Sequence, residues 1–171
     1  MASDAFDILG LPPRFNLTEA EIERAWLSKI ATTHPDASGD DDAEAASALN
    51  TAKDELEDSE RRANLVLNRL GGPSAEQDNS LPDGFLMEIF SVREEMESRL
   101  ASGSDAARDD LQQWASERRA EHIARVGGLF DSADDPEVRL TIRRELNVWR
   151  YTERMIEQLD PGYDPNTADF R

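Results

Sequence analysis

The chain has 171 residues, enough for one ordinary domain or two small ones. Its 37 acidic and 19 basic residues give a formal net charge of −18, which opposes binding to nucleic acid and to anionic membrane surfaces. The absence of cysteine excludes disulfides, cysteine nucleophiles, and zinc or iron–sulfur centres held by thiolates of this chain.

The composition also bears on location and fold class. The first residues, Met1 to Ala5, lack the basic and apolar regions of a signal peptide, and no stretch approaches 18 apolar residues. We therefore expect a cytoplasmic protein without a membrane span. With 38% hydrophobic and 33% charged residues, extended helices are favoured, because a narrow apolar stripe on a helix suffices to build a core.

The N-terminal sequence predicts a short helix followed by a long one. The short helix, over 4–11, ends at Gly10 and the prolines after it. The long helix begins at Thr18, which forms a capping box with Glu21, and we expect Pro35 to end it. Its residues at helical spacing predict one buried face, made by Ile22, Ala25, Trp26, Ile30 and Thr33.

Two further helices are predicted before residue 74. Residues 37–42 form a loop whose aspartates precede the third helix, which carries a stripe of Ala45, Leu49, Ala52 and Leu56. Asp58 caps the fourth helix, and Gly71-Gly72-Pro73 ends it. The fourth helix has a stripe of Ala63, Val66, Leu67 and Leu70.

The second half of the chain predicts three more helices, over 84–101, 105–130 and 136–159. The last of these starts at Asp135-Pro136, with aspartate at the cap and proline at the first helical position. No stretch alternates long enough for a strand, so the fold class is all-α. We expect an N-terminal domain, a linker, a C-terminal three-helix domain and a frayed tail, at 1–73, 74–80, 81–160 and 161–171.

The tripeptide His34-Pro35-Asp36 lies between two helices that would pack antiparallel. One interpretation is simple helix termination, since histidine suits the last turn, proline stops a helix and aspartate favours turns. The other is a functional loop at the tip of a helical hairpin.

The surrounding sequence resembles the J-domain family, the partners of DnaK-type (heat-shock protein 70 family) ATPases. The matching segments are the opening helix at 6–11, the His-Pro-Asp loop between two long helices, and the segment 56–63 that joins the third and fourth helices. Three further segments, at 62–67, 85–95 and 122–131, are similar to HscB-type J-proteins of iron–sulfur cluster assembly. The resemblance covers nearly the whole chain except the linker and the tail.

The resemblance implies a co-chaperone that is not an enzyme and needs no cofactor. Its J-domain would bind the chaperone's nucleotide-binding domain and favour ATP hydrolysis, and its C-terminal domain would bind the iron–sulfur cluster scaffold protein. The chaperone-binding residues implied for this chain are His34, Pro35, Asp36, Arg24 and Lys29.

The helix over 84–101 carries two sets of apolar residues. One stripe, made by Phe85, Ile89, Val92, Met96 and Leu100, is sufficient to pack the helix on its neighbours. Leu86, Met87 and Phe90 fall on another flank, beside Glu94. Either the helix is buried on a wide face, or this flank binds a partner. The resemblance implies that these four residues hold the scaffold protein, although Ser91 replaces an acidic residue common in the family.

Other departures concern the chaperone-binding surface. J-domains usually have several basic residues on the second helix and a tyrosine before the histidine. Here three glutamates crowd the helix start, Thr33 takes the tyrosine position, and Lys53 replaces an aromatic residue of the third helix. We therefore expect weak electrostatic steering toward the chaperone.

Two alternatives remain open. A metal-dependent or hydrolytic enzyme would use His34 with nearby carboxylates such as Asp40-Asp41-Asp42, but the spacing of a calcium loop is absent. The second histidine, His122, is interpreted as a surface or partly buried residue rather than a ligand. The other alternative is a J-domain co-chaperone, or a J-like adaptor, for a different client.

Overall fold

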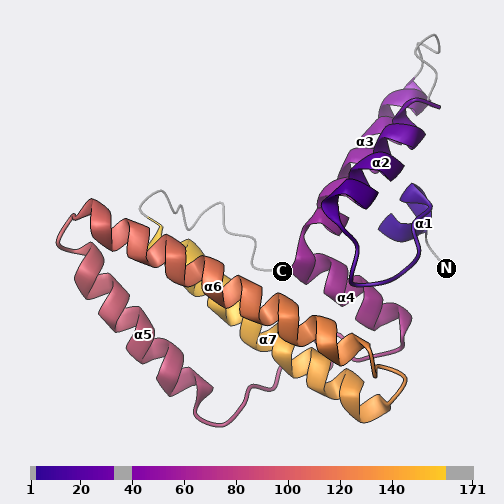
Figure 1. Ribbon diagram of the computed structural model, residues 1–171. Helices are drawn as coiled ribbons and strands as arrows, with labels where there is room; N and C mark the ends of the chain where they lie inside the picture. The colour runs from indigo at the N-terminus through magenta and orange to yellow at the C-terminus, as the bar shows by residue number, and fades with distance from the viewer. Residues whose placement is uncertain (1–2, 33–39, 161–171) are drawn as a thin grey trace.

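The structure, a computed structural model, describes residues 3–32 and 40–160 of the chain (Figure 1). This part of the chain contains seven helices and no strand, so the all-α prediction is confirmed. The helices are α1 (Ala5–Leu9), α2 (Glu19–Ile30), α3 (Asp40–Glu57), α4 (Ser59–Arg69), α5 (Phe85–Leu100), α6 (Asp105–Phe130) and α7 (Pro136–Leu159).

In the N-terminal half, α2 and α3 form a hairpin against which α1 packs, and α4 lies at its base (Figure 1). The core between these helices is apolar, with Phe6, Ile22 and Leu56 fully buried. The indole Nε1 of Trp26 donates to Asn50 Oδ1 at 3.0 Å, which fixes α2 against α3. The hairpin thus has both a packed interior and a specific hydrogen bond between its helices.

The predicted start signals of these helices are confirmed. Glu21 N donates to Thr18 Oγ1 at 3.3 Å and Thr18 N donates to Glu21 Oε2 at 2.9 Å, which completes the capping box. The Asp58 carboxylate accepts from Arg61 N at 2.9 Å and caps α4. Gly10 ends α1 with φ at 69°, a left-handed conformation that glycine adopts at no steric cost.

Four details of the N-terminal prediction were wrong. Helix α2 ends at Ile30, well before Pro35, and α3 begins at Asp40, so the three aspartates start the helix instead of preceding it. Ala45 is exposed, because the far end of the hairpin consists of two helices with no third element to cover it. Leu70 is 38% exposed, since it caps the end of α4 beyond the packed part of that helix.

In the C-terminal half, α6 and α7 run side by side, and α5 packs against their far ends (Figure 1). The apolar cluster that joins the three helices consists of Ile89, Met96, Leu111, Met155 and Leu159. Arg93 of α5 donates to Gln158 Oε1 of α7 at 2.8 Å, and Arg99 of α5 pairs with Asp110 of α6. The bounds of all three helices agree with the predicted ranges to within one residue.

The two halves share one apolar core where α4 lies against α7. The N-terminal half contributes Phe15, Ala63 and Leu67, and the C-terminal half contributes Val126, Ala133, Ile142, Leu146 and Trp149. All eight side chains are at most 3% exposed. Burial on this scale makes the contact between the halves part of the folded structure.

The loop before α2 is built into this shared core. Phe15 packs on Phe130 of α6 with ring centroids 5.4 Å apart. A Cβ atom on Gly127 would lie 3.3 Å from Asn16 Oδ1 and 3.5 Å from the Phe15 ring, so glycine permits the close approach. The buried Arg62 of α4 donates from Nε to Phe15 O at 2.8 Å, and burial lowers the pKa of its guanidinium.

A second polar network fixes residues 74–80, the predicted linker. Arg143 of α7, which is 3% exposed, donates to Asn64 Oδ1 of α4 at 2.7 Å and to Asn147 Oδ1 at 2.9 Å. Asn147 Nδ2 in turn donates to the backbone oxygens of Asp78, at 3.1 Å, and Ser80, at 2.9 Å. This segment is therefore bound to α7. The division into domains stays a prediction, and the predicted tail, 161–171, lies outside the described residues.

Candidate functional site

The first candidate site is the end of the α2–α3 hairpin. His34, Pro35 and Asp36, together with Thr33, lie outside the described residues, so their role stays a prediction. The last described residue of the α2 side is Thr32, whose hydroxyl donates to Lys29 O at 2.7 Å. Helix α3 begins at Asp40, at the same end of the hairpin (Figure 1). The tripeptide thus belongs to the segment that joins two antiparallel helices at their exposed end.

Two basic residues of α2 were predicted to help chaperone binding. Both Arg24 and Lys29 are exposed, but they are five residues apart and so lie about 140° apart around the helix. Arg24 Nε donates to Ala20 O at 2.9 Å, which holds its side chain along α2. The Lys29 amine lies toward Gly10, where a Cβ atom would be 3.7 Å from its Nζ. The two cations therefore face different sides of the hairpin.

Leu27 is an exposed apolar residue on the same helix that sequence reasoning missed. It is 50% exposed and lies one turn after Arg24 on the outer surface of α2. The signal available in the sequence was its absence from the predicted buried face. Arg24 and Leu27 thus give the outer surface of α2 one exposed cationic and one exposed apolar side chain.

The second candidate site is the exposed flank of α5, which we call the α5 patch and define as Leu86, Met87, Phe90 and Glu94. The three apolar side chains are 41%, 81% and 62% exposed, and Glu94 is exposed as well. The alternative that α5 is buried on a wide face is therefore wrong. The structure brings all four residues to one flank of one helix.

The patch is exposed because a different set of residues holds α5 in the bundle. Ile89 and Met96 are buried, and the partly buried Phe85, Val92 and Leu100 pack against the same cluster, as the spacing predicted. The helix starts at Gly84, whose φ of 84° turns the chain into its first residue. Isolated exposed apolar residues are common, but three within five residues of one helix form a continuous apolar surface.

An exposed aromatic residue of α7 packs against the start of α5. Tyr151 is 42% exposed, and its ring meets the Phe85 ring edge-on with centroids 6.1 Å apart. Sequence reasoning missed Tyr151, although it falls outside the α7 core residues Trp149 and Met155. Tyr151 thus contacts the packed side of the first turn of α5.

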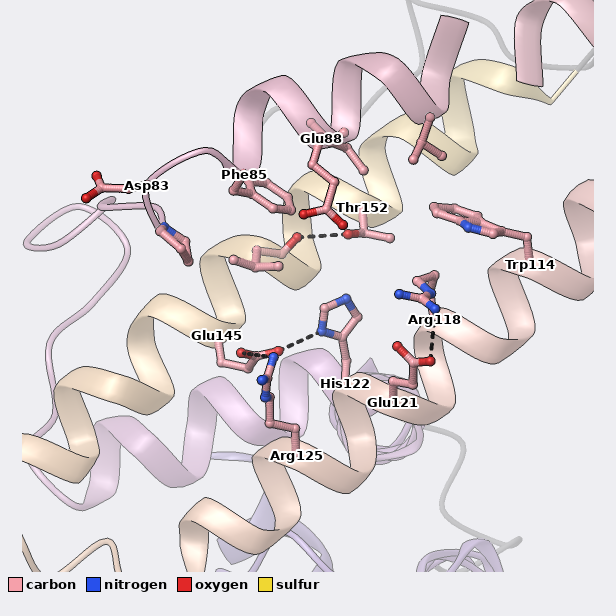
Figure 2. A pocket seen from close by; sticks show the side chains of 14 residues that line it. Asp83, Phe85, Glu88, Trp114, Arg118, Glu121, His122, Arg125, Glu145 and Thr152 are labelled. Carbon is pink, nitrogen blue, oxygen red and sulfur yellow. Dashed lines mark hydrogen bonds and ion pairs between the residues drawn. The ribbon is translucent and has the colours of Figure 1, made fainter. Parts of the chain in front are cut away.

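A solvent-accessible cleft of about 610 Å³ lies between α5, α6 and α7, on the inner side of α5 (Figure 2). Its apolar walls include Phe85 and Ile89 of α5, Trp114 of α6 and Val148 of α7. Figure 2 shows that Glu88 points from α5 toward this space, opposite the charged side chains of α6. The cleft and the α5 patch thus lie on two sides of the same helical turns.

The polar floor of the cleft is held by ion pairs. Arg125 lies 3.3 Å from one oxygen of Glu145, and His122 Nδ1 lies 3.0 Å from the other (Figure 2). The His122 ring also stacks on Trp149 with centroids 5.5 Å apart. Of the two interpretations of His122, a surface residue or a partly buried one, the structure excludes the surface one, since the residue is only 8% exposed. It falls on the face of α6 that packs on α7, where Glu145 satisfies its ring nitrogen.

The described residues contain neither a metal-binding cluster nor a membrane-spanning helix. No group of three or more His, Asp or Glu side chains within that part of the chain is placed to hold a metal ion. No helix among residues 3–32 and 40–160 has the length and apolar character needed to cross a membrane.

Comparisons with known proteins agree with this arrangement in both halves. Residues 4–65 match the DnaJ domain family, and residues 81–160 match the HSCB C-terminal oligomerisation domain family. Among curated proteins, the chain is 28% identical over 163 residues to the co-chaperone protein HscB homolog of Burkholderia mallei (strain SAVP1), covering 91% of this chain and 93% of that protein. The homolog from Burkholderia multivorans (strain ATCC 17616 / 249) is also 28% identical, with the same coverage.

Two solved structures share the fold. Chaperone HscB from Vibrio cholerae superposes with a TM-score of 0.67 at 21% identity, covering 92% of this chain and 95% of that one. Human co-chaperone protein HscB superposes with a TM-score of 0.69 at 19% identity, covering 91% and 80%. Since both halves match in order, and since the matches extend over nearly the whole described chain, the protein belongs to the HscB-type family of J-domain co-chaperones.

Proposed function

We propose that this protein stimulates the ATPase of a DnaK-type (heat-shock protein 70 family) chaperone in the cytoplasm and delivers the iron–sulfur cluster scaffold protein to it. Membership of the HscB-type family supports a J-domain co-chaperone of iron–sulfur cluster assembly. The observation that carries the delivery step is the exposed apolar surface of α5. The family is one of co-chaperones, so we assign the chain no reaction of its own.

The chaperone would be bound by the His-Pro-Asp loop and the adjoining surface of α2. In this proposal the Asp36 carboxylate accepts a charge-assisted hydrogen bond from a chaperone arginine, while His34 and Pro35 fix the shape of the loop. Arg24 and Leu27 add a cationic and an apolar contact on the outer surface of α2. Because such contacts favour one conformation of the chaperone, they shift its conformational equilibrium toward the state that hydrolyses ATP.

The scaffold protein would be bound by the α5 patch. Leu86 and Met87 are flexible apolar side chains that adapt to a partner surface, and Phe90 supplies a rigid aromatic anchor. Glu94 adds an acidic residue at the rim, which favours a partner with complementary positive charge.

The shared core between the halves supports delivery rather than two independent binding events. Because Phe15 and Leu67 of the N-terminal half are buried with Ile142 of the C-terminal half, both surfaces belong to one folded body. A scaffold bound to α5 would then be held near the chaperone at a raised effective concentration. In the proposal, this is the physical basis of cargo delivery.

The chaperone step is tested by measuring ATP turnover of a cognate DnaK-type chaperone with the intact chain. His34→Gln is expected to abolish stimulation while leaving the circular dichroism spectrum and the denaturation midpoint unchanged. Glu44→Gln, an exposed change on α3, serves as the control and is expected to keep full stimulation. Stimulation that survives His34→Gln would remove the loop from the proposed mechanism.

The cargo step is tested by titration calorimetry with the candidate scaffold protein. The double variant Leu86→Ala/Phe90→Ala is expected to weaken binding by about a hundredfold, since each hot-spot side chain contributes ~1–2 kcal/mol or more. The control Leu70→Ala/Ile123→Ala truncates two exposed apolar residues away from α5, Leu70 at the end of α4 and Ile123 on α6, which are 38% and 39% exposed. ATPase stimulation without scaffold binding by the intact chain would instead indicate a different client.

A further inference from the structure

The ring of Trp26 on α2 is held by two side chains of α3. Its indole Nε1 donates to Asn50 Oδ1 at 3.0 Å, and the Lys53 ammonium lies over its face, 4.9 Å from the ring centroid. An ammonium group within about 6 Å of an aromatic ring centroid is attracted by the ring. The ring is thus fixed both at its edge and at its face. We call Trp26, Asn50 and Lys53 together the Trp26 clamp.

A carboxylate of α3 supports the cation of the clamp. Asn50, Lys53 and Glu57 are spaced at i, i+3 and i+7, so they lie along one side of the helix. The Glu57 carboxylate lies 3.3 Å from Lys53 Nζ and draws the ammonium to this side of α3. Lys53, which departs from the family pattern at this position, therefore has a specific partner on α2.

The clamp lies at the outer end of the packed core of the hairpin. On α2, Ile30 packs against this core one turn after Trp26. On α3, Leu49 is 7% exposed, whereas the side chains at 43–48 are exposed or half-buried. Beyond Leu49, α3 thus continues toward Asp40 without a buried side chain among those that the structure describes (Figure 1).

A small change of orientation at the clamp produces a larger displacement at the end of the hairpin. At about 1.5 Å per residue, Asp40 lies about 15 Å along α3 from Asn50. A tilt of about 10° between the helices would therefore move the start of α3 by about 2–3 Å. Apolar packing alone is non-directional, whereas a hydrogen bond depends on the angle between its groups. The clamp contacts are thus suited to fix the orientation of α2 against α3.

We propose that Trp26, Asn50 and Lys53 are positioning residues for chaperone stimulation, which hold α2 and α3 in the orientation that presents the His-Pro-Asp segment between them to the chaperone. This inference rests on the proposed function, because that segment is the one assigned to chaperone binding. The clamp acts through the hairpin and not by contact with the chaperone. Since Trp26 and Glu57 engage the Lys53 ammonium, we assign it this role rather than electrostatic steering.

The test with the chaperone uses the full chain. Titration of a cognate DnaK-type chaperone separates the maximal stimulation of ATP turnover from the half-saturating concentration of the chain. Asn50→Ala/Lys53→Met is expected to lower maximal stimulation about three- to tenfold, because the His-Pro-Asp segment is presented in a wrong orientation. The half-saturating concentration is expected to change by less than about twofold, because the outer surface of α2 is unchanged. Lys53→Arg keeps a cation over the ring and is expected to keep full stimulation.

Thr18→Ala is the control for stability. It removes the N-cap of the same helix at the end away from the His-Pro-Asp segment, so it weakens α2 without touching the clamp. Its denaturation midpoint in urea is expected to fall about as far as that of the double variant, but its maximal stimulation is expected to stay within about twofold of the wild type. An equal loss of stimulation in both variants, or none in the double variant, would overturn the inference and leave the proposed function intact.

A second measurement does not depend on the chaperone. Because the chain contains no cysteine, spin labels can be attached through Ala31→Cys and Glu44→Cys, at two exposed residues beyond the clamp. The distribution of distances between the labels, measured by pulsed electron paramagnetic resonance, is expected to broaden or shift with Asn50→Ala/Lys53→Met and to stay unchanged with Thr18→Ala. An unchanged distribution in the double variant would contradict the positioning role, even if the wild-type chain failed to stimulate the chaperone and so contradicted the proposed function.

Discussion

The guanidinium of Arg143 in α7 donates a hydrogen bond of 2.7 Å to Asn64 Oδ1 in α4, and so joins the C-terminal half to the N-terminal half. Burial lowers the pKa of this guanidinium, but its hydrogen bonds to Asn64 and Asn147 compensate part of the cost of desolvation. The contact therefore depends on polar groups that are satisfied only when both halves are folded together.

Asn64→Ala tests this contact. Removal of the amide leaves a buried guanidinium N–H without its acceptor, so we expect a loss of about 1.5–3 kcal/mol in the free energy of unfolding. The measurement is equilibrium denaturation in urea. Asn68→Ala is the matched control, because Asn68 is exposed on the same helix, and its effect should stay within about 0.5 kcal/mol. Equal losses in both variants would contradict a structural role of the Arg143–Asn64 hydrogen bond.

Leu67→Ala tests the shared core. Leu67 is 1% exposed among side chains of both halves, so its truncation is expected to lower the free energy of unfolding by about 2–5 kcal/mol. Trp26 reports on the N-terminal half and Trp114 on the C-terminal half. The fluorescence of each residue is measured in a variant that keeps only that tryptophan. The two fluorescence changes are expected to coincide in one unfolding transition.

Leu70→Ala on the same helix is the control for this variant, since Leu70 is 38% exposed and should lose far less stability. Two separate unfolding transitions in the single-tryptophan variants that keep Leu67 would show that the halves fold independently. That result would contradict the shared core.

Glu60→Gln tests an electrostatic feature of the contact between the halves. Glu60 of α4 lines a cavity of about 310 Å³ together with Arg150 and Glu153 of α7. Burial raises the pKa of its carboxyl to about 7, from an ordinary value of 4.5. Nearby Arg150 opposes this rise, and Asp58 and Glu153 add to it.

The sign of the effect follows from the two pKa values. Between pH 4.5 and 7 the unfolded chain has lost the proton of Glu60 while the folded chain keeps it, so stability falls as the pH rises through this range. At pH 8, the free energy of unfolding of Glu60→Gln is expected to exceed that of the wild type by at most about 3 kcal/mol. Below pH 4.5 the two proteins should be similar. Glu76→Gln, at an exposed residue of the segment 74–80, should show no such pH dependence.

Ile89→Ala and Phe90→Ala separate the two surfaces of α5. Ile89 is 9% exposed in the bundle core, whereas Phe90 is 62% exposed. The first variant is expected to lower the free energy of unfolding by about 2 kcal/mol or more, and the second by about 0.5 kcal/mol or less, although the second removes a larger side chain. Thermal and urea denaturation measure both. A larger loss for Phe90→Ala would mean that Phe90 packs inside the bundle.

Much of the fold could be predicted because the relevant signals are local. The capping box of Thr18 and Glu21, the Asp58 and Asp135 caps, and the spacing of Ile89 and Met96 depend on residues within one or two turns of each other. The same spacing left Leu86, Met87 and Phe90 outside the core stripe, and the structure exposes all three.

The features that escaped prediction depend on contacts between distant segments. Phe15 lies in a loop, and its place in the shared core is set by α4 and α6. Arg62 and Arg143 are charged residues whose burial is possible only because oxygen atoms from other segments accept their hydrogen bonds. His122 is buried for the same reason, since Glu145 comes from the neighbouring helix. No periodicity in one segment reports such partners.

The shared core has a consequence for protein engineering. A J-domain grafted in front of α5 has to supply counterparts of Phe15, Ala63 and Leu67, because without them Ile142 and Leu146 would be left in water. A functional chimera has to transplant these contact residues, and Asn64 with them. The same constraint applies to natural variation: a substitution in one half of the shared core is tolerated only when the residues of the other half still pack against it.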